Sequence, residues 1–147
     1  MRTATARVGA ALTVAAAAIA VGHSMANTMA NTMANAEPAA HQVRYTLTAA
    51  GGADFDLFYL TTQPPNKAAY NANPYAFVKK EPVTLAPGVP WVFETTLADP
   101  QWAIFTVSST THGGQAAPNP HCDIAVDGQV VVQQDGPYNL QCQLSQW

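Results

Sequence analysis

The residues with the most definite chemistry are two cysteines, Cys122 and Cys142, and the chain contains no others. Each lies in a segment where apolar and polar residues alternate, and each falls on the apolar side of its segment. Successive side chains of a strand point to opposite faces, so both thiols are expected to face a core. An even pair in an exported chain indicates a disulfide, whereas two thiols without a second pair of ligands make a poor zinc site. The sequence therefore predicts a disulfide between them.

Two histidines near the first cysteine could suggest a metal site. His112 and His121 lie in or beside a segment rich in glycine, proline and asparagine, and Cys122 directly follows His121. The disulfide already requires Cys122, and no carboxylate or histidine stands at a spacing that would complete a ligand set. We therefore expect no metal, and no motif indicates another cofactor.

Paired carboxylates could act as a general acid and a general base. Asp54 and Asp56 stand two residues apart, which places both on one face of a strand. Such residues more often form the solvated side of a half-buried sheet, and we adopt that interpretation. Several serines are present, yet none lies in a Gly-x-Ser-x-Gly motif or another nucleophile signature. We therefore expect no catalytic residues and no enzymatic activity.

Residues 61–82 are rich in proline and asparagine, which predicts a long surface excursion because proline interrupts strand ladders. Exposed aromatic side chains on such a segment would mark an interaction site, whereas a segment that folds back would bury them over a sheet edge. Both alternatives remain open at this point. Neighbouring lysines would add a basic spot to the site or would only be solvated. The candidate contact residues are Tyr70, Tyr75, Phe77, Lys79 and Lys80.

The start of the chain has the composition of an export signal. Arg2 and Arg7 form a short basic region, and residues 8–22 are uncharged and rich in alanine and valine. With a small-residue cleavage site, this is the pattern of a secretory signal peptide. The apolar core is short for a spanning helix, which needs about 20 residues.

Cleavage is expected after Ala26 or after Ala36, near the start or at the end of three tetrapeptide repeats that read Met-Ala-Asn-Thr, Met-Ala-Asn-Thr and Met-Ala-Asn-Ala. We therefore assign residues 1–36 to a signal-peptide helix and low-complexity linker, and residues 42–147 to the folded domain. The protein is expected in the periplasm or cell envelope, or in the medium.

Without residues 1–36 the chain is acidic. Four basic residues then stand against nine carboxylates, which gives a net charge of −5. Scattered basic residues form no phosphate-binding stripe, so nucleic acid is not expected as a partner.

From residue 42 the hydrophobic pattern has a period of two, which is typical of strands. The pattern and the turn residues predict an all-β fold, an immunoglobulin-like β-sandwich of about seven strands with one disulfide. Glycines at 51 and 52 predict a hairpin between the first two strands, and Asp127-Gly128 predicts another. Trp91 could be a ligand platform, but a tryptophan within a sandwich strand is usually part of the core. The strands are expected at 43–48, 54–59, 83–85, 89–97, 102–109, 122–126, 129–133 and 138–145, with room for a short one at 75–78.

An ordered set of short motifs resembles the extracytoplasmic domain of the MmpS family of small mycobacterial membrane proteins. Its most specific parts are a Pro-Trp step and a Cys-x-Ile-x-Val-Asp-Gly hairpin with a second cysteine about 20 residues further on. The similarity covers most of residues 42–145. The motifs are Val43-Arg44-Tyr45-Thr46-Leu47, Val89-Pro90-Trp91, Cys122-Asp123-Ile124-Ala125-Val126-Asp127-Gly128-Gln129-Val130-Val131 and Cys142.

This resemblance implies a β-sandwich outside the cytoplasmic membrane that assists a large MmpL-type transporter in exporting lipids or siderophores. The family offers no established catalytic residues. Three features depart from it: the N-terminus looks cleavable rather than anchored, and the segments 63–82 and 112–120 look longer. We therefore expect a non-enzymatic accessory or binding protein, whose partner is an MmpL-type transporter or an amphipathic envelope molecule. The alternative is a freely secreted structural or interaction protein without a transporter partner.

Overall fold

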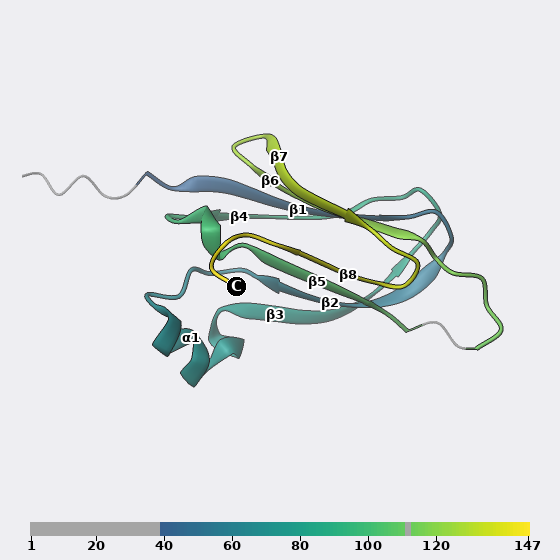
Figure 1. Ribbon diagram of the computed structural model, residues 1–147, viewed down its shortest axis with the longest axis horizontal. Coiled ribbons are helices and arrows are strands. Elements are labelled where there is room, and N and C mark those ends of the chain that lie inside the picture. The colour runs from purple at the N-terminus through teal and green to yellow at the C-terminus, as the bar shows by residue number, and fades with distance from the viewer. Residues whose placement is uncertain (1–38, 111–112) are drawn as a thin grey trace, which may run out of the picture. The chain divides into compact units, whose positions relative to one another are not determined.

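A computed structural model describes residues 39–110 and 113–147, which form a sandwich of two four-stranded antiparallel sheets (Figure 1). The first sheet has the strand order β4-β1-β6-β7 and the second has the order β3-β2-β5-β8. The expected all-β sandwich is thereby confirmed. The strands are β1 (His41–Ala49), β2 (Ala53–Leu60), β3 (Val78–Leu85), β4 (Trp91–Leu97), β5 (Ile104–Ser109), β6 (Pro120–Val126), β7 (Gln129–Asp135) and β8 (Asn139–Gln143).

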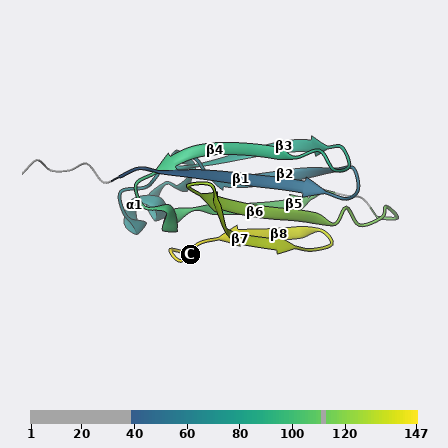
Figure 2. The same ribbon diagram turned by 90° about the horizontal axis from the view of Figure 1, so that it is seen from above.

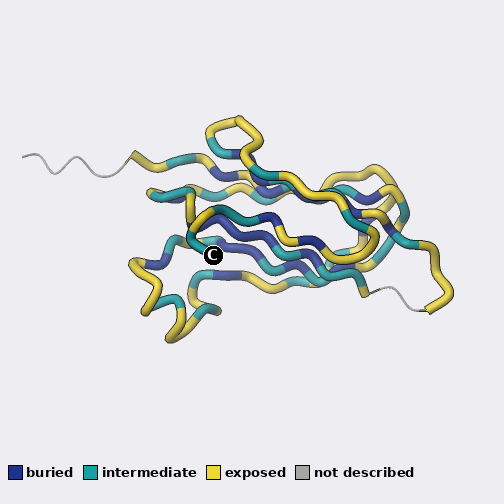
Figure 3. The backbone as a smooth tube through the Cα atoms, viewed as in Figure 1, coloured by how far each residue is buried: buried dark blue, intermediate teal, exposed yellow. Residues whose placement is uncertain are grey.

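The core lies between the two sheets and is built from the alternate residues of the central strands. Buried and less buried positions alternate along these strands, as the bands of Figure 3 show. Four aromatic side chains, Tyr45, Tyr59, Phe55 and Phe105, are the largest fully buried ones. The alternation arises because one face of each sheet packs on the other sheet and the opposite face meets water.

The predicted hairpin at Asp127-Gly128 is confirmed as the turn between β6 and β7. Asp127 has a φ of 50° and Gly128 a φ of 82°, the left-handed values that a two-residue hairpin turn needs. The turn is also tied to the start of β1. The Gln42 N–H donates to Oδ1 of Asp127 at 2.9 Å, and Nδ1 of His41 lies 2.7 Å from Oδ2.

The predicted hairpin between the first two strands is wrong. β1 pairs with β4 and β6, whereas β2 pairs with β3 and β5 in the other sheet. The turn at Gly51-Gly52 therefore carries the chain from one sheet to the other. Alternation within each strand specifies which side chains face the core, but it does not specify the neighbouring strand.

The expected surface excursion ends earlier than residue 82. It contains a short helix, α1 (Lys67–Ala72), and a 3-10 turn, η1 (Pro74–Ala76), after which β3 begins at Val78. Asn66 caps α1, because its side-chain oxygen accepts a hydrogen bond from the Ala69 N–H at 2.8 Å. β3 runs through Pro82 because it is an edge strand, where a missing N–H costs no ladder bond.

The disulfide prediction is confirmed. Cys122 on β6 and Cys142 on β8 are bonded and fully buried, and the bond joins the two sheets. Figure 2 shows the sandwich from above. The edge strands β7 and β8 lie side by side at one side of the sandwich, and the edge strands β4 and β3 lie at the other.

The predicted signal peptide and linker, residues 1–36, and His112 lie outside the described residues. Among the described residues, no helix has the length and apolar character needed to cross a bilayer.

Candidate functional site

The segment between β2 and β3 is closed at its base by the backbone. The N–H groups of Thr61 and Thr62 both donate to the carbonyl oxygen of Phe77, at 2.8 and 3.1 Å, and the Thr61 hydroxyl donates to it at 3.1 Å. Pro64 is among the fully buried side chains. Residues 61–77 therefore form a compact projection rather than an open loop. In Figure 1 this projection, which contains α1, lies beyond the last residue of β2 and the first residue of β3.

The C-terminal residues hold this projection. The ring of Trp147 packs edge-on against Tyr70 of α1, with centroids 4.5 Å apart, and against Trp102 at 5.7 Å. The Trp147 indole N–H donates to the carbonyl oxygen of Trp102 at 2.9 Å, and Nζ of Lys67 donates to the carbonyl oxygen of Gln146 at 2.6 Å. Tyr70 is consequently half-buried. We call the contacts of Trp147 with Tyr70 and Trp102 the clasp.

The three aromatic residues proposed as contacts have three different environments. Phe77 is partly buried against the hydrophobic core, and Tyr70 is held by Trp147. Tyr75, in η1, is 74% exposed. Both alternatives for this segment are thus realised: two rings fold back and one projects into solvent.

The two lysines lie on opposite faces of β3, as neighbours in a strand must. Lys80 opposes Phe58 on β2, and its Nζ lies 3.9 Å from the Asp56 carboxylate on the outer face of the second sheet. Lys79 opposes the buried Tyr59 and forms an ion pair with Glu81. The structure therefore does not bring the two lysines together in one basic spot.

Glu81 is a residue that the sequence analysis did not single out. It lies on the core-facing side of β3, opposite Leu57, and accepts a hydrogen bond from the Tyr59 hydroxyl at 2.8 Å. Burial, followed by the hydrogen bond to Glu81, raises the pKa of Tyr59 to about 12. The hydrogen bond from Lys79 is the main cause that lowers the pKa of Glu81. The alternation of inward and outward residues, continued across Pro82, would have predicted this inward-facing carboxylate.

Trp91 lies at the border of the core rather than at its centre. Its ring is half-buried, 5.0 Å from Tyr59 and 5.4 Å from Phe105 by ring centroids. Phe93, two residues further along β4, packs on Tyr59 at 4.7 Å. An aromatic cluster therefore closes the sandwich on the β3–β4 side, and Glu81 with Lys79 borders it.

The two aspartates proposed as a carboxylate pair lie on the outer face of β2, as expected for solvated residues. Asp54 accepts a hydrogen bond from the Thr84 hydroxyl, whereas Asp56 faces Lys80. Each carboxylate thus interacts with a different neighbour on β3.

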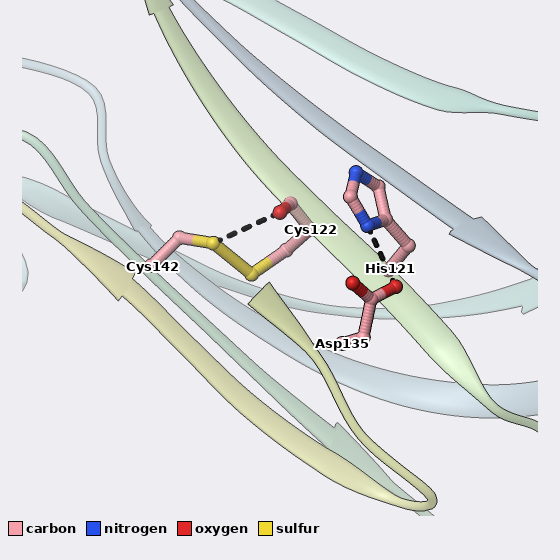
Figure 4. The surroundings of a disulfide bond; sticks show 4 residues. All are labelled: His121, Cys122, Asp135 and Cys142. Carbon is pink, nitrogen blue, oxygen red and sulfur yellow. Dashed lines mark hydrogen bonds and ion pairs between the residues drawn. A yellow bond between two sulfur atoms is a disulfide. The ribbon is translucent and has the colours of Figure 1, made fainter. Parts of the chain in front are cut away.

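His121 pairs with Asp135 across the β6–β7 hairpin. Its Nδ1 lies 2.8 Å from Oδ1 of Asp135, on the opposite side of β6 from the disulfide of Cys122 (Figure 4). Within residues 39–110 and 113–147, no three histidine, cysteine, aspartate or glutamate side chains come together as metal ligands. A second pair, His41 with Asp127, lowers the pKa of Asp127 through its hydrogen bond.

Comparison with known proteins identifies relatives of this domain. Residues 45–142 match the family described as the Rv2576c beta-sandwich domain. The chain is 42% identical over 113 residues to the uncharacterized protein Rv2576c of Mycobacterium tuberculosis (strain ATCC 25618 / H37Rv). The aligned region covers 76% of this chain and 71% of the relative. The uncharacterized protein Mb2606c of Mycobacterium bovis has the same identity and coverage. This chain therefore belongs to the Rv2576c beta-sandwich domain family.

Proposed function

We propose that this protein is a non-enzymatic binding or accessory domain that works outside the cytoplasmic membrane. On this proposal it acts like the MmpS-type partners of lipid or siderophore exporters, which its motifs resemble. Its partner is an MmpL-type transporter or an amphipathic envelope molecule, and the projection of residues 61–77 is the contact surface.

The observation that carries the proposal is the position of Tyr75. Its ring is 74% exposed on a projection whose base is closed by hydrogen bonds and whose side is held by Trp147. Because the backbone of this segment is already held, less conformational entropy is lost when it binds, and the tyrosine ring presents a large amphipathic surface. Tyrosine is also among the residues that dominate the binding energy of protein interfaces.

A further observation supports a role outside the cytoplasm. The disulfide between Cys122 and Cys142 is of the kind that persists in oxidising compartments.

Co-purification with a co-expressed MmpL-type transporter tests the proposal. The wild-type protein is expected to retain the transporter, and Tyr75→Ala is expected to lose most of it. Tyr138→Ala is the matched control, because Tyr138 is also exposed, at 44%, but lies outside the projection. If the wild type and Tyr75→Ala retain the transporter equally, the projection is not the contact surface.

If none of the three proteins retains a transporter, the lipids bound to each are compared by mass spectrometry. Loss of a bound amphipathic lipid only in Tyr75→Ala would support the envelope-molecule form of the proposal. If the protein binds neither and accumulates in the medium, the freely secreted alternative holds instead.

A further inference from the structure

A groove crosses the outer face of the second sheet at the end of the sandwich away from α1 (Figure 1). It consists of two hollows of about 310 and 420 Å³, which adjoin because Asp54, Thr84 and Thr110 line both. β2 begins at this end, β3 ends there, and the segment after β5 borders the groove. The groove is therefore separate from the projection, which follows the last residue of β2.

Asp54 is the fixed centre of this groove. Its backbone carbonyl oxygen accepts a hydrogen bond from the Thr110 N–H at 2.9 Å and another from the Thr110 hydroxyl at 3.1 Å. Its Oδ1 accepts a hydrogen bond from the hydroxyl of Thr84, which lies directly opposite on β3. The side chains that line the groove are thus held in place by one another, which lowers the entropy cost of binding a ligand.

These bonds leave mainly hydrogen-bond acceptors for a ligand. A threonine hydroxyl has one proton and two lone pairs, and the protons of Thr84 and Thr110 are both donated to Asp54. Within the described residues, no group donates to the second carboxylate oxygen of Asp54. Asp56 adds a second carboxylate to the lining. A ligand of this groove must therefore present several donors, so an anionic ligand is excluded.

The spacing of the acceptors distinguishes among ligands that donate. Asp54 and Asp56 stand two residues apart on β2, which is about 7 Å along a strand. In residues 39–110 and 113–147, no three carboxylates, histidines or cysteines converge as metal ligands. Pro82, directly opposite Asp56, adds an apolar surface, and Gln115 adds an amide that both donates and accepts. Separated acceptors beside an apolar surface suit a ring with hydroxyl groups at its edge and C–H groups on its face.

We infer that this groove binds a saccharide. Its hydroxyl groups donate to the carboxylates of Asp54 and Asp56, and the C–H face of a sugar ring packs on Pro82. Hydrogen bonds to an ionised acceptor are about twice as strong as those between neutral groups, so two carboxylates favour a ligand rich in hydroxyl donors. The Gln115 amide donates to a ring or hydroxyl oxygen. A saccharide bound here leaves the projection and its exposed Tyr75 free for another partner.

Titration with oligosaccharides, followed by NMR of the isotopically labelled protein recovered after export, tests the inference. The probes are cellohexaose, maltohexaose, mannohexaose and galactohexaose. At least one of them is expected to shift the backbone N–H signals of Asp54, Thr84 and Thr110 in a saturable way. If none of the four does so, the inference is wrong. Shifts confined to residues 61–77 would place the saccharide on the projection, which would overturn this inference but not the proposed function.

A pair of variants tests the role of the carboxylate. Asp54→Asn is expected to weaken saccharide binding at least about tenfold, because it keeps the shape of the side chain but removes the charge and one acceptor oxygen. Glu94→Gln is the matched control, since it removes the same charge from an exposed residue on the first sheet, and it is expected to bind as the wild type does. Circular dichroism verifies that both variants are folded. Equal affinity of all three proteins would contradict the inference.

Spermine serves as the competing probe, because an ammonium group also donates hydrogen bonds to carboxylates. The inference predicts that spermine does not replace a saccharide as the ligand of the groove. If spermine shifts the signals of Asp54, Thr84 and Thr110 and no oligosaccharide does, the groove is a site for cationic amines and the inference fails.

Discussion

Cys122 on β6 and Cys142 on β8 are covalently linked with their Cα atoms 6.3 Å apart, although the two strands belong to different sheets. The bond is therefore a covalent connection through the core, in addition to the hydrophobic contacts between the sheets. It also fixes β8 near β6, beside the edge strand β7.

Replacing both cysteines, as Cys122→Ala with Cys142→Ala, is expected to lower the free energy of unfolding by about 3 kcal/mol. The main physical reason is the larger conformational entropy of an unfolded chain that no longer contains a closed loop. Urea unfolding of the two proteins measures the difference. A double variant as stable as the wild type would mean that the bond adds nothing to the packing of the two sheets.

The buried phenol of Tyr59 predicts a loss of stability at high pH. Its pKa is raised from 10.0 to about 12, so the unfolded chain ionises this group first as the pH rises. The contribution of the neutral Tyr59 phenol to the free energy of unfolding is fully present below pH 10. As the pH rises toward 12, the free energy of unfolding falls by about 2–3 kcal/mol.

Tyr59→Phe removes this contribution and also costs about 1 kcal/mol at neutral pH, because the hydrogen bond to Glu81 is lost. Urea unfolding at a series of pH values compares the two proteins. The pKa of Tyr45 is also raised by burial, so Tyr45 contributes equally to the alkaline loss of stability in the wild type and in Tyr59→Phe. Identical alkaline slopes for wild type and Tyr59→Phe would contradict the assigned environment of Tyr59.

The turn between β6 and β7 requires glycine at position 128. Its φ of 82° lies in the left-handed region, so Gly128→Ala is expected to cost about 1 kcal/mol. Gly113→Ala is the control, because Gly113 has no positive φ and no atom lies within 4 Å of an added Cβ. The midpoints of urea unfolding separate the two variants, and equal midpoints would count against the turn geometry.

The clasp made by Trp147 is expected to protect α1 from proteolysis. Trp147→Ala removes two ring contacts and a hydrogen bond, which together stabilise the projection by about 2 kcal/mol. Trypsin should then cleave faster after Lys67, at the start of α1. Tyr138→Ala, which changes an exposed ring elsewhere, should leave the cleavage rate unchanged. Equal rates for all three proteins would show that the clasp does not hold the projection.

The sequence was sufficient to predict the features that depend on local patterns. Period-two alternation predicted the sandwich and the burial of both cysteines, and Asp127-Gly128 predicted its hairpin because few residue pairs adopt two left-handed conformations. Strand pairing was not predictable in the same way. The turn at Gly51-Gly52 looks the same whether the chain stays in one sheet or crosses to the other, so the β1–β2 hairpin was wrong.

The candidate site depended on contacts between distant parts of the chain. Tyr70 is half-buried because Trp147, far from it in sequence, packs on its ring, and no local signal announces that contact. Lys79 and Glu81 looked like part of a solvated excursion because Pro82 follows them. At a sheet edge proline is tolerated, and the strand continues with Glu81 half-buried and with the exposed Lys79 paired to it.

The proposed function requires that this domain leaves the cytoplasm and that its disulfide forms outside. Mass spectrometry of the protein from the cells that produce it, alkylated before reduction, tests this directly. The peptides containing Cys122 and Cys142 are expected to remain linked, and the mature chain is expected to begin after Ala26 or Ala36. Alkylation of both thiols in a chain that still begins at Met1 would contradict it.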